Sequence, residues 1–425
     1  MILFIVLFFA FMFLGMPIAF CMVASSAVYV YQSGLNPRVI VEKFLAGPDS
    51  FTLLAVPFFI LAANLMNTGG ITERIFNFAR KAVGHITGGL GHVNIFASVI
   101  FAGMSGAAVA DAGGLGQIEL KAMREAGFDD DFSLAVTGAS STVGPVIPPS
   151  IPAVVFAVTS GVSVGRVFIA GVIPGIIMAL AMAVVVYFWA KKKGYPVDPK
   201  SSLMERLVAF KRAFLSLMTP IIIIGGILSG YFTPTESAII TCVYALILSL
   251  VVYRTIKLRD LKGILLETAI STTGTLLIIA AAAVFGWVLA YERVPQMLSR
   301  SFLAVFSDKY AMLMMIMIIL LVVGCFMETI AAITIMTPVF IPIISKLGID
   351  PVHFGVVMIL NLMIGLITPP VGLVLYTLSN VSGVPFHRIA KATVPYLIVL
   401  FVVLVILCFV PQLSLFLPDQ IFGPS

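Results

Sequence analysis

Two apolar segments of this sequence are interrupted in the same way, by a glycine followed after three residues by two prolines. These are residues 144–149 (GPVIPP) and residues 365–370 (GLITPP), and residues 103–154 align without a gap on residues 324–375. Because proline has no backbone N–H, a helix must open at each pair and leave carbonyl oxygens without a partner. In a membrane such oxygens are tolerated only inside protein or at a cavity, where they suit a cation such as Na⁺.

We expect each break to face the glycine-bearing turn of a neighbouring hairpin and to form a small cage of oxygens with it. The first predicted Na⁺ site comprises Gly103, Met104, Ser105, Gly144, Ile147 and Pro148. The second comprises Gly324, Cys325, Gly365, Thr368 and Pro369. A proline kink without a ligand would explain either copy alone. Two copies at matching places in two halves favour the binding site of a secondary transporter.

Few charged residues lie inside apolar sequence, and an ionisable group there is a hypothesis for a functional site. Asp111 and Glu328 each follow a predicted hairpin tip, where they could ligate a cation, carry a proton or shape a polar cavity. Asp111 could also simply anchor its own helix. Arg293 could bind a substrate carboxylate through two hydrogen bonds, or be an interfacial arginine or an ion-pair partner of Glu292. The candidate substrate-binding residues are Arg293, Glu328, Ser150, Ser160 and Asp111.

The composition identifies the class of protein that holds these residues. The chain is 60% hydrophobic and only 10% charged, and its mean hydropathy is +1.14. Soluble domains have about a quarter charged residues, so this is an integral membrane protein. Successive long apolar runs predict an all-α polytopic bundle rather than a barrel of alternating strands.

The organisation that we expect is a pair of inverted repeats, each with a re-entrant helical hairpin and a broken helix. Membrane spans are expected at 1–31, 50–68, 131–160 (broken), 166–190, 213–232, 236–253, 268–291, 352–381 (broken) and 393–416. The hairpins are expected at about 90–125 and 311–346. The predicted division is a scaffold helix in 1–49, a first repeat in 50–190, a cytoplasmic linker with scaffold helices in 191–270, a second repeat in 271–416 and a tail in 417–425.

The basic residues indicate an orientation. With a cytoplasmic N-terminus, the expected path leaves 18 lysines and arginines on cytoplasmic segments and 7 outside, in agreement with the positive-inside rule. The first hairpin then opens to the cytoplasm and the second to the outside, so the two copies are inverted. The basic residues therefore set topology and do not indicate a nucleic-acid partner.

Several other functions have weaker support in the sequence. There is no Walker phosphate loop and no HExxH motif, so neither ATP hydrolysis nor zinc-protease chemistry is expected. The GMSG sequence around Ser105 resembles an intramembrane serine-protease site but lacks a matched histidine. Glu236 follows Thr233 and Pro234 in a capping-box pattern, which predicts a helix start rather than a functional acid. A channel or an H⁺-coupled exchanger that uses the carboxylates as a proton relay remains an alternative.

Long motifs across nearly the whole chain resemble the large membrane subunit of tripartite ATP-independent periplasmic (TRAP) transporters. They are PFFILAANLMNTGGI at 57–71, GMSGAAVADAGGLG at 103–116, GPVIPPSIP at 144–152, TPTESA at 233–238, ETIAAITIMTPVFIPI at 328–343 and NLMIGLITPPVGLVLY at 361–376. The chain is similar to the sialic-acid branch as well as to the C4-dicarboxylate branch, and we favour sialic acid.

The resemblance implies an elevator mechanism in the bacterial inner membrane, driven by at least two Na⁺. It implies a separate small four-helix membrane subunit and a soluble periplasmic protein that delivers the carboxylate substrate. In such relatives an arginine and an acidic residue near the second hairpin belong to the proposed substrate site. By motif these positions are Arg293 and Glu328, with a glutamate here in place of an aspartate.

Overall fold

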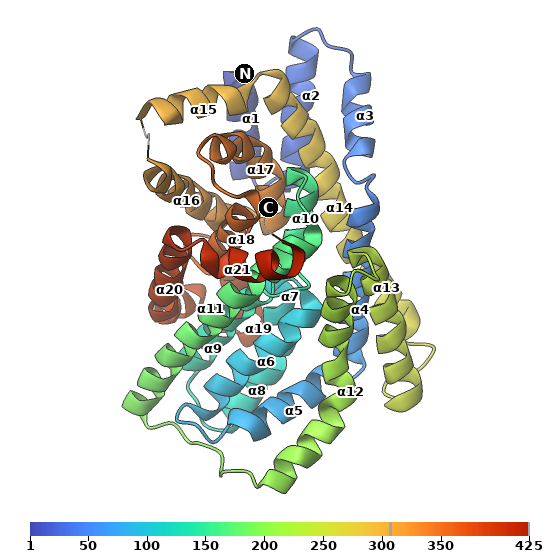
Figure 1. Ribbon diagram of the computed structural model, residues 1–425, viewed down its shortest axis with the longest axis vertical. Helices are drawn as coiled ribbons and strands as arrows, with labels where there is room; N and C mark the ends of the chain where they lie inside the picture. The colour runs from blue at the N-terminus through green and yellow to red at the C-terminus, as the bar shows by residue number, and fades with distance from the viewer. Residues whose placement is uncertain (306–307, 424–425) are drawn as a thin grey trace.

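The computed structural model describes residues 1–305 and 308–423, and within these residues it contains helices and no strands (Figure 1). Eight of the described helical segments are long and apolar enough to cross a membrane, which takes about 20 apolar residues. The predicted all-α polytopic fold is therefore confirmed.

The first repeat holds the first predicted hairpin and the first broken helix. Its elements are η1 (Phe51–Leu54), α4 (Ala55–Thr68), α5 (Ile71–Val83), α6 (Gly89–Ser105), α7 (Ala108–Gly113), α8 (Leu115–Glu125), α9 (Asp130–Ser140), η2 (Ser141–Val143), α10 (Ile151–Ser160) and α11 (Val164–Lys193). Helix α6 runs to the hairpin tip, and α7 and α8 return from it. Helices α9 and α10 are the two halves of the broken helix.

The remaining helices form the N-terminal region, the connection between the repeats and the second repeat. They are α1 (Ile2–Phe13), α2 (Ile18–Gln32), α3 (Arg38–Ala46), α12 (Leu203–Leu228), α13 (Pro234–Ile247), η3 (Leu248–Val252), α14 (Leu261–Tyr291), α15 (Val294–Val305), α16 (Lys309–Phe326), α17 (Thr329–Lys346), α18 (Pro351–Leu366), α19 (Leu373–Ser382), α20 (Phe386–Phe409) and α21 (Gln412–Phe422). Helices α16 and α17 form the second hairpin, and α18 and α19 the second broken helix. Helix α13 begins with the predicted capping box of Thr233 and Glu236.

The two hairpins enter the molecule from opposite ends. In Figure 1 the hairpin of α6, α7 and α8 opens toward the lower end, which carries the connection between α11 and α12. The hairpin of α16 and α17 opens toward the upper end, where α15 lies. The short amphipathic helices α5 and α15 each precede a hairpin in the chain, one at either end of the molecule.

The single N-terminal span predicted for residues 1–31 is wrong. The chain turns between Phe13 and Ile18, where Gly15 has a positive φ of 83° and Pro17 precedes the first turn of α2. Helices α1 and α2 pack antiparallel, because the rings of Phe4 and Tyr29 lie 5.8 Å apart. Met1 therefore lies at the same end of the molecule as the α2–α3 connection (Figure 1).

Two other expected boundaries also differ. The predicted span 393–416 combines parts of two helices, since α20 ends at Phe409 and α21 begins at Gln412 after Pro411. The predicted polar linker 191–212 is mostly helical, because the Ser202 cap starts α12 at Leu203 and only residues 194–202 connect it to α11. The division into functional domains stays a prediction.

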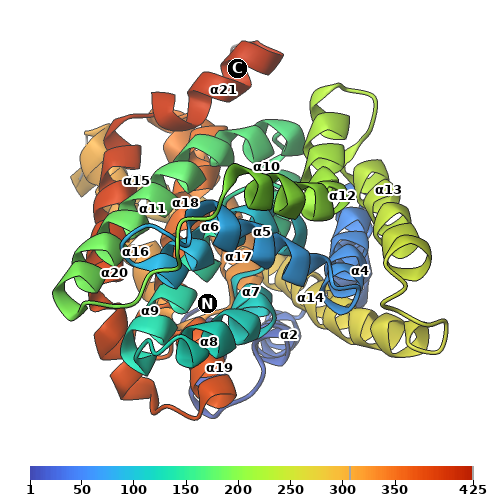
Figure 2. The ribbon, with the colours of Figure 1, turned by 90° about the horizontal axis from the view of Figure 1, so that it is seen from below.

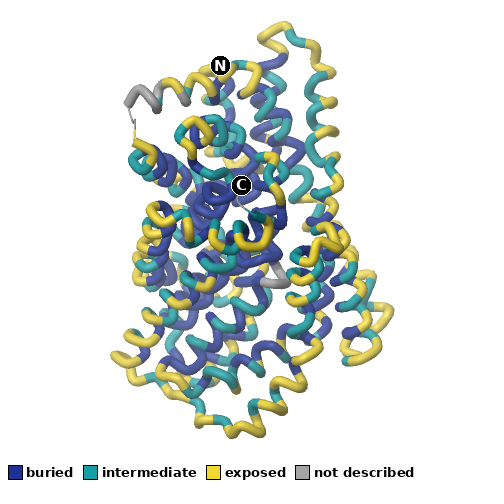
Figure 3. The backbone as a smooth tube through the Cα atoms, viewed as in Figure 1, coloured by how far each residue is buried: buried dark blue, intermediate teal, exposed yellow. Residues whose placement is uncertain are grey.

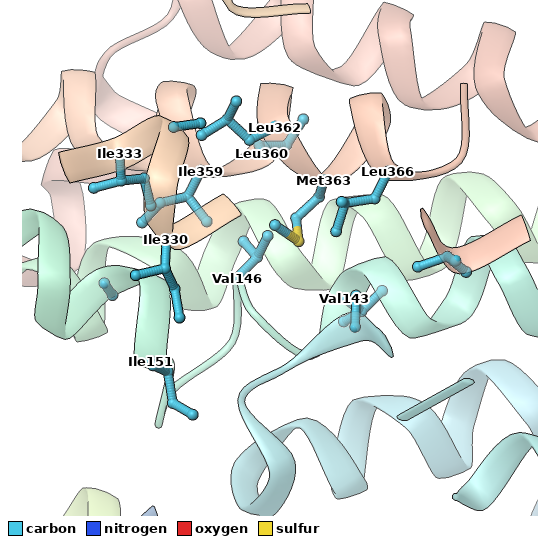
Figure 4. Close-up of a cluster of buried hydrophobic side chains, with 14 of the residues drawn as sticks. Val143, Val146, Ile151, Ile330, Ile333, Ile359, Leu360, Leu362, Met363 and Leu366 are labelled. Atoms are coloured by element: carbon cyan, nitrogen blue, oxygen red, sulfur yellow. The ribbon is translucent and has the colours of Figure 1, made fainter. Parts of the chain in front are cut away.

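The core lies where the two repeats meet. Helix α10 packs against α17 and α18, and Figure 4 shows apolar side chains from both repeats in contact there, including Val146, Ile151, Ile330, Ile359 and Met363. Buried residues gather along the middle of the molecule, and exposed residues follow the outer helices (Figure 3). Helix α12 is the most exposed of the membrane spans, because only 22% of its most apolar 18-residue stretch is buried.

Candidate substrate and cation sites

The first helix break lies between α9 and α10, and residues 144–150 are all buried. Helix α10 begins at Ser150, whose hydroxyl accepts a hydrogen bond from Ala153 N at 3.1 Å and donates one to the Pro145 carbonyl. Gly144 keeps right-handed helical dihedrals, with φ −51° and ψ −53°. The prolines therefore open this helix, and the glycine does so without leaving the helical region.

The tip of the first hairpin contacts this break directly. Gly106 ends α6 with a φ of +60°, and a Cβ built on it would lie 3.0 Å from the Pro149 carbonyl oxygen and 3.2 Å from Ile151 N. The predicted opposition of turn and break is therefore present. The carbonyl of Gly144 has no helical donor, because Pro148 occupies the position four residues on. The side chains of residues 103–105, which belong to the first predicted Na⁺ site, lie outside the described residues.

The second break repeats this arrangement between α18 and α19. A Cβ on Gly365 would lie only 2.6 Å from the carbonyl carbon of Gly324 in the facing hairpin helix. Thr368 donates a hydrogen bond from Oγ1 to the Ile364 carbonyl at 2.7 Å, which leaves the lone pairs of its oxygen for another partner. Gly372 then starts α19 with a φ of +57°.

The two breaks differ in their exposure. Every residue of the first break is buried, whereas Pro369 and Pro370 of the second are exposed and Thr368 is half-buried. Both sites present backbone and hydroxyl oxygens, the donor type that a hard monovalent cation takes at unwound membrane helices. We expect the buried site to exchange its ion with water more slowly than the exposed one.

One cavity connects the two repeats. It has a volume of about 630 Å³, and both hairpin tips and both breaks contribute to its lining. Its lining includes Gly106, Ala107, Pro145, Ile151, Glu328, Thr329, Met363 and Leu366 from the hairpins and broken helices, and Asn64, Asn67, Glu267, Ser271 and Thr275 from α4 and α14. The lining reaches Asn380 near the end of α19, so the cavity extends toward the lower end of the molecule in Figure 1.

Glu328 is the predicted substrate residue that the structure places in this cavity. It is the N-cap of α17, and its carboxylate accepts hydrogen bonds from Ile330 N at 2.8 Å and Ala331 N at 3.3 Å. The carboxylate is half-buried, and no cation pairs with it among the described residues. The helix N-terminus holds this negative charge in place, at the wall of the cavity.

The other predicted substrate residues do not line the cavity. The Ser150 hydroxyl caps α10 and also donates to the Pro145 carbonyl across the break. Ser160, at the other end of α10, donates to the Phe156 carbonyl. Asp111 is only 2% exposed and lies beside Ser98 behind the hairpin tip. Arg293 is exposed, has a φ of +57°, and lies in the connection between α14 and α15.

The alternative of an ion pair between Arg293 and Glu292 finds no support, since the described ion pairs do not include it. Glu292 instead accepts a hydrogen bond from the Tyr29 hydroxyl. This bond joins α2 to the end of α14.

The sequence analysis did not identify the residues of α11 that pack against the first break. A Cβ on Gly171 of α11 would lie 2.1 Å from the Val146 carbonyl oxygen, and one on Gly175 would lie 2.3 Å from the Ile147 side chain. These glycines let α11 approach the break closely. The signal was present as a G-x-x-x-G pattern in an apolar helix, which is typical of close helix contacts in membranes.

A second missed feature ties each broken helix to its hairpin. Ser140 donates to Asn94 Oδ1 of α6 at 2.6 Å, and Asn361 donates from Nδ2 to the Met317 carbonyl of α16 at 2.7 Å. Positions 140 and 361 correspond under the repeat alignment. Glu119, only 1% exposed on α8 near Asp111, was also missed.

Comparison with known proteins places this architecture in a family. Residues 5–413 match the family model of the tripartite ATP-independent periplasmic transporter, DctM component. The chain belongs to this family. It is thus a TRAP transporter large permease, a multi-pass membrane protein and not an enzyme.

Several named relatives match this chain along nearly its whole length. The chain is 47% identical to the sialic acid TRAP transporter large permease protein SiaM of Vibrio cholerae, over 97% of both chains. It is 42% identical to the sialic acid TRAP transporter permease protein SiaT of Haemophilus influenzae, over 96% of this chain and 66% of that one. It is 40% identical to the C4-dicarboxylate large permease DctM of Pseudomonas aeruginosa, over 90% of each.

Solved structures share the fold of this TRAP permease. The YdaH transporter of Alcanivorax borkumensis superposes with a TM-score of 0.65 at 16% identity and covers 91% of this chain and 89% of its own. MtrF of Neisseria gonorrhoeae superposes with a TM-score of 0.61 at 13% identity, over 87% of this chain and 82% of its own.

Proposed function

We propose that this TRAP large permease imports sialic acid by Na⁺-coupled symport. The observation that carries the proposal is the cavity that touches both hairpin tips and both helix breaks. A cation held at either break would lie in the wall of the substrate cavity, so that ion and substrate binding would stabilise the same arrangement. Each of the two cages would hold one Na⁺, which gives at least two ions for each transport cycle. The ligands would be the residues of the two Na⁺ sites predicted from the sequence.

The lining of the cavity favours a solute rich in hydroxyl groups. Asn64, Asn67, Ser271 and Thr275 supply amides and hydroxyls on the α4 and α14 side, and the volume of about 630 Å³ lies within the range of small-molecule sites. Two of the relatives named above transport sialic acid by name, and the third is named for C4-dicarboxylates. A C4-dicarboxylate is therefore the alternative substrate.

The driving force is sufficient for uptake against a gradient. Two Na⁺ with one monoanion carry one net charge, which is worth about 2.3 kcal/mol at about 100 mV. A tenfold Na⁺ gradient adds about 1.4 kcal/mol for each ion. A total of about 5 kcal/mol would sustain an accumulation of several thousandfold.

We propose an elevator movement for alternating access. Helices α4 and α14 form one wall of the cavity, and the hairpins and broken helices form the other. The second group would move as one body past the first, carrying both cages and the substrate. The cavity extends toward the lower end of Figure 1, so the structure would represent a state open to that side.

The orientation in the bacterial inner membrane follows from charge. No lysine or arginine precedes Arg38, so the partition of 18 and 7 basic residues is unchanged by the N-terminal turn. We propose that the lower, more basic end faces the cytoplasm. Because α1 and α2 are antiparallel, Met1 then lies on the periplasmic side, opposite to the cytoplasmic N-terminus expected from a single first span.

Two partners complete the proposed transporter. The outer surface of α12, α13 and α14 is apolar and largely exposed, as expected for a scaffold that a small four-helix membrane subunit extends. A periplasmic binding protein would deliver sialic acid at the end opposite to the basic connection between α11 and α12.

A second candidate mechanism has one observation in its favour. Asp111 and Glu119 are buried carboxyl groups without an ion-pair partner among the described residues, and Glu328 lines the cavity. Such groups could carry protons and make the protein an H⁺-coupled exchanger. The coupling ion therefore decides between the two mechanisms.

Uptake into proteoliposomes tests the proposal. The vesicles would hold this chain and its small partner, with the cognate binding protein and labelled N-acetylneuraminate outside. We expect accumulation only with an inward Na⁺ gradient and with the binding protein present. Uptake of C4-dicarboxylates instead would replace the substrate, and uptake driven by a proton gradient without Na⁺ would overturn the symport mechanism.

A further inference from the structure

A second cavity lies at the basic end of the molecule, away from the substrate cavity. It has a volume of about 790 Å³ and is enclosed by α5, the 194–202 connection and the first turns of α12. None of its lining residues lines the substrate cavity. Figure 2 views this end directly and shows α5 beside α12.

The lining of this cavity has an excess of positive charge. Four cations line it, namely Arg74, Arg80, Lys81 and Arg212, against the two carboxylates of Asp198 and Glu205. Arg80 binds Asp198 through two hydrogen bonds of 2.7 and 3.0 Å, and Lys81 lies 3.7 Å from Glu205. Among the described residues no carboxylate pairs with Arg74 or Arg212, so two positive charges face the cavity without a counterion.

Arg74 is held in position by neighbouring aromatic and polar groups. Its guanidinium lies 3.9 Å from the centre of the Tyr253 ring, and its Nε is buried without a hydrogen-bond partner. The Tyr253 hydroxyl lies 3.1 Å from Ser216 Oγ of α12. A guanidinium stacked in this way keeps its edge free for an anion and loses little freedom on binding one.

An apolar surface adjoins these charges. Phe78, Met204 and Val208 line the same cavity, and Met204 and Val208 are 69% and 43% exposed. The apolar side chains continue along α12 to Phe210 and Phe214, whose rings lie 5.7 Å apart. Because α12 is the least buried of the described spans, this strip near its N-terminal end is exposed on the surface of the chain.

We propose that this cavity binds the phosphate of an anionic phospholipid of the cytoplasmic leaflet, with Arg74 and Arg212 on the phosphate and the acyl chains along α12. Basic pockets beside membrane helices on the cytoplasmic side are suited to such headgroups. A free phosphate shares the headgroup chemistry, but it would make no use of the exposed apolar strip. The bound lipid would join α5, which leads to the first hairpin, to the scaffold helix α12.

Lipid binding by the purified chain with its small partner tests the proposal. The complex would be placed in phosphatidylcholine nanodiscs and titrated with phosphatidylglycerol, with bound lipid measured by native mass spectrometry. We expect the double variant Arg74→Gln/Arg212→Gln to bind phosphatidylglycerol about thirtyfold more weakly than the unmodified chain, since each basic residue contributes about fivefold at an anionic surface.

The matched control is Lys257→Gln/Arg259→Gln, which removes two charges at the same end but outside the cavity. This control variant should bind phosphatidylglycerol with the same affinity as the unmodified chain. Equal binding by all three proteins, or binding of inorganic phosphate as tight as that of phosphatidylglycerol in the same measurement, would overturn the proposal. The variant Arg74→Lys/Arg212→Lys keeps both charges and should keep most of the binding. A loss in it as large as in the glutamine variant would mean defective packing and would equally overturn the proposal.

Discussion

Gly324 and Gly365 touch backbone to backbone, because a Cβ on Gly365 would lie 2.6 Å from the carbonyl carbon of Gly324 and 2.9 Å from its oxygen. One glycine lies on the second hairpin and the other on the broken helix that faces it. No side chain fits between them, so the proposed cage oxygens of the two elements are held at a fixed separation. This contact makes position 365 the most direct test of the paired-cage mechanism.

We expect Gly365→Ala to reduce Na⁺-dependent uptake by about tenfold or more, because the added methyl group forces the hairpin away from the break. Gly365→Leu, and Gly144→Leu in the first repeat, should abolish uptake while the protein still folds. Initial rates at several Na⁺ concentrations would measure this. Gly225→Ala in α12 is the control, since nothing lies within 4 Å of its added Cβ. Normal rates in both leucine variants would refute the mechanism.

Glu328→Gln distinguishes a binding role from a proton relay. The amide oxygen can still accept the hydrogen bonds that cap α17, so the variant should fold normally. We expect Na⁺ dependence and the maximal rate to be retained, while the KM for sialic acid rises by about tenfold through the loss of a charged hydrogen bond. Uptake as a function of substrate and Na⁺ would separate these quantities. Complete loss of transport at saturating substrate would instead support proton transfer by this carboxylate.

Arg293→Gln tests a residue that the family resemblance assigns to the substrate site but that the structure leaves outside the cavity. Because its side chain is exposed and does not line the cavity, we expect the KM for sialic acid to change by less than about twofold, as for other surface substitutions. The same uptake assay would measure it beside Glu328→Gln. A rise in KM as large as that of Glu328→Gln would show that Arg293 reaches the substrate in another conformation.

The turn between α1 and α2 predicts the side of the N-terminus. Single cysteines at Ile2 and Ser33 should react with a membrane-impermeant maleimide from one side of the membrane, and a cysteine at Lys192 from the other. The native cysteines are buried and should contribute little background. Labelling of positions 2 and 33 from opposite sides would restore a single N-terminal span and contradict the antiparallel pair.

The sequence determined the membrane class, the two helix breaks and the hairpins that face them. These features depend on local chemistry: Pro148–Pro149 and Pro369–Pro370 cannot donate hydrogen bonds, and Thr233 and Glu236 form their capping box within a single turn. The repeat alignment then paired each break with a hairpin. A proline or a cap acts in the same way wherever the helix lies, so these predictions did not need the tertiary structure.

Only the tertiary structure decided which polar residues meet. Glu328 lines the cavity whereas Asp111, Ser160 and Arg293 do not, because the direction a side chain faces depends on helices distant in the sequence. The turn after Phe13 was hidden for the same reason: apolar residues continue through it, and only the antiparallel packing of α2 on α1 shows that the chain reverses. Local sequence thus determines where the helices break, and the packing of distant helices determines which side chains line the cavity between the two breaks.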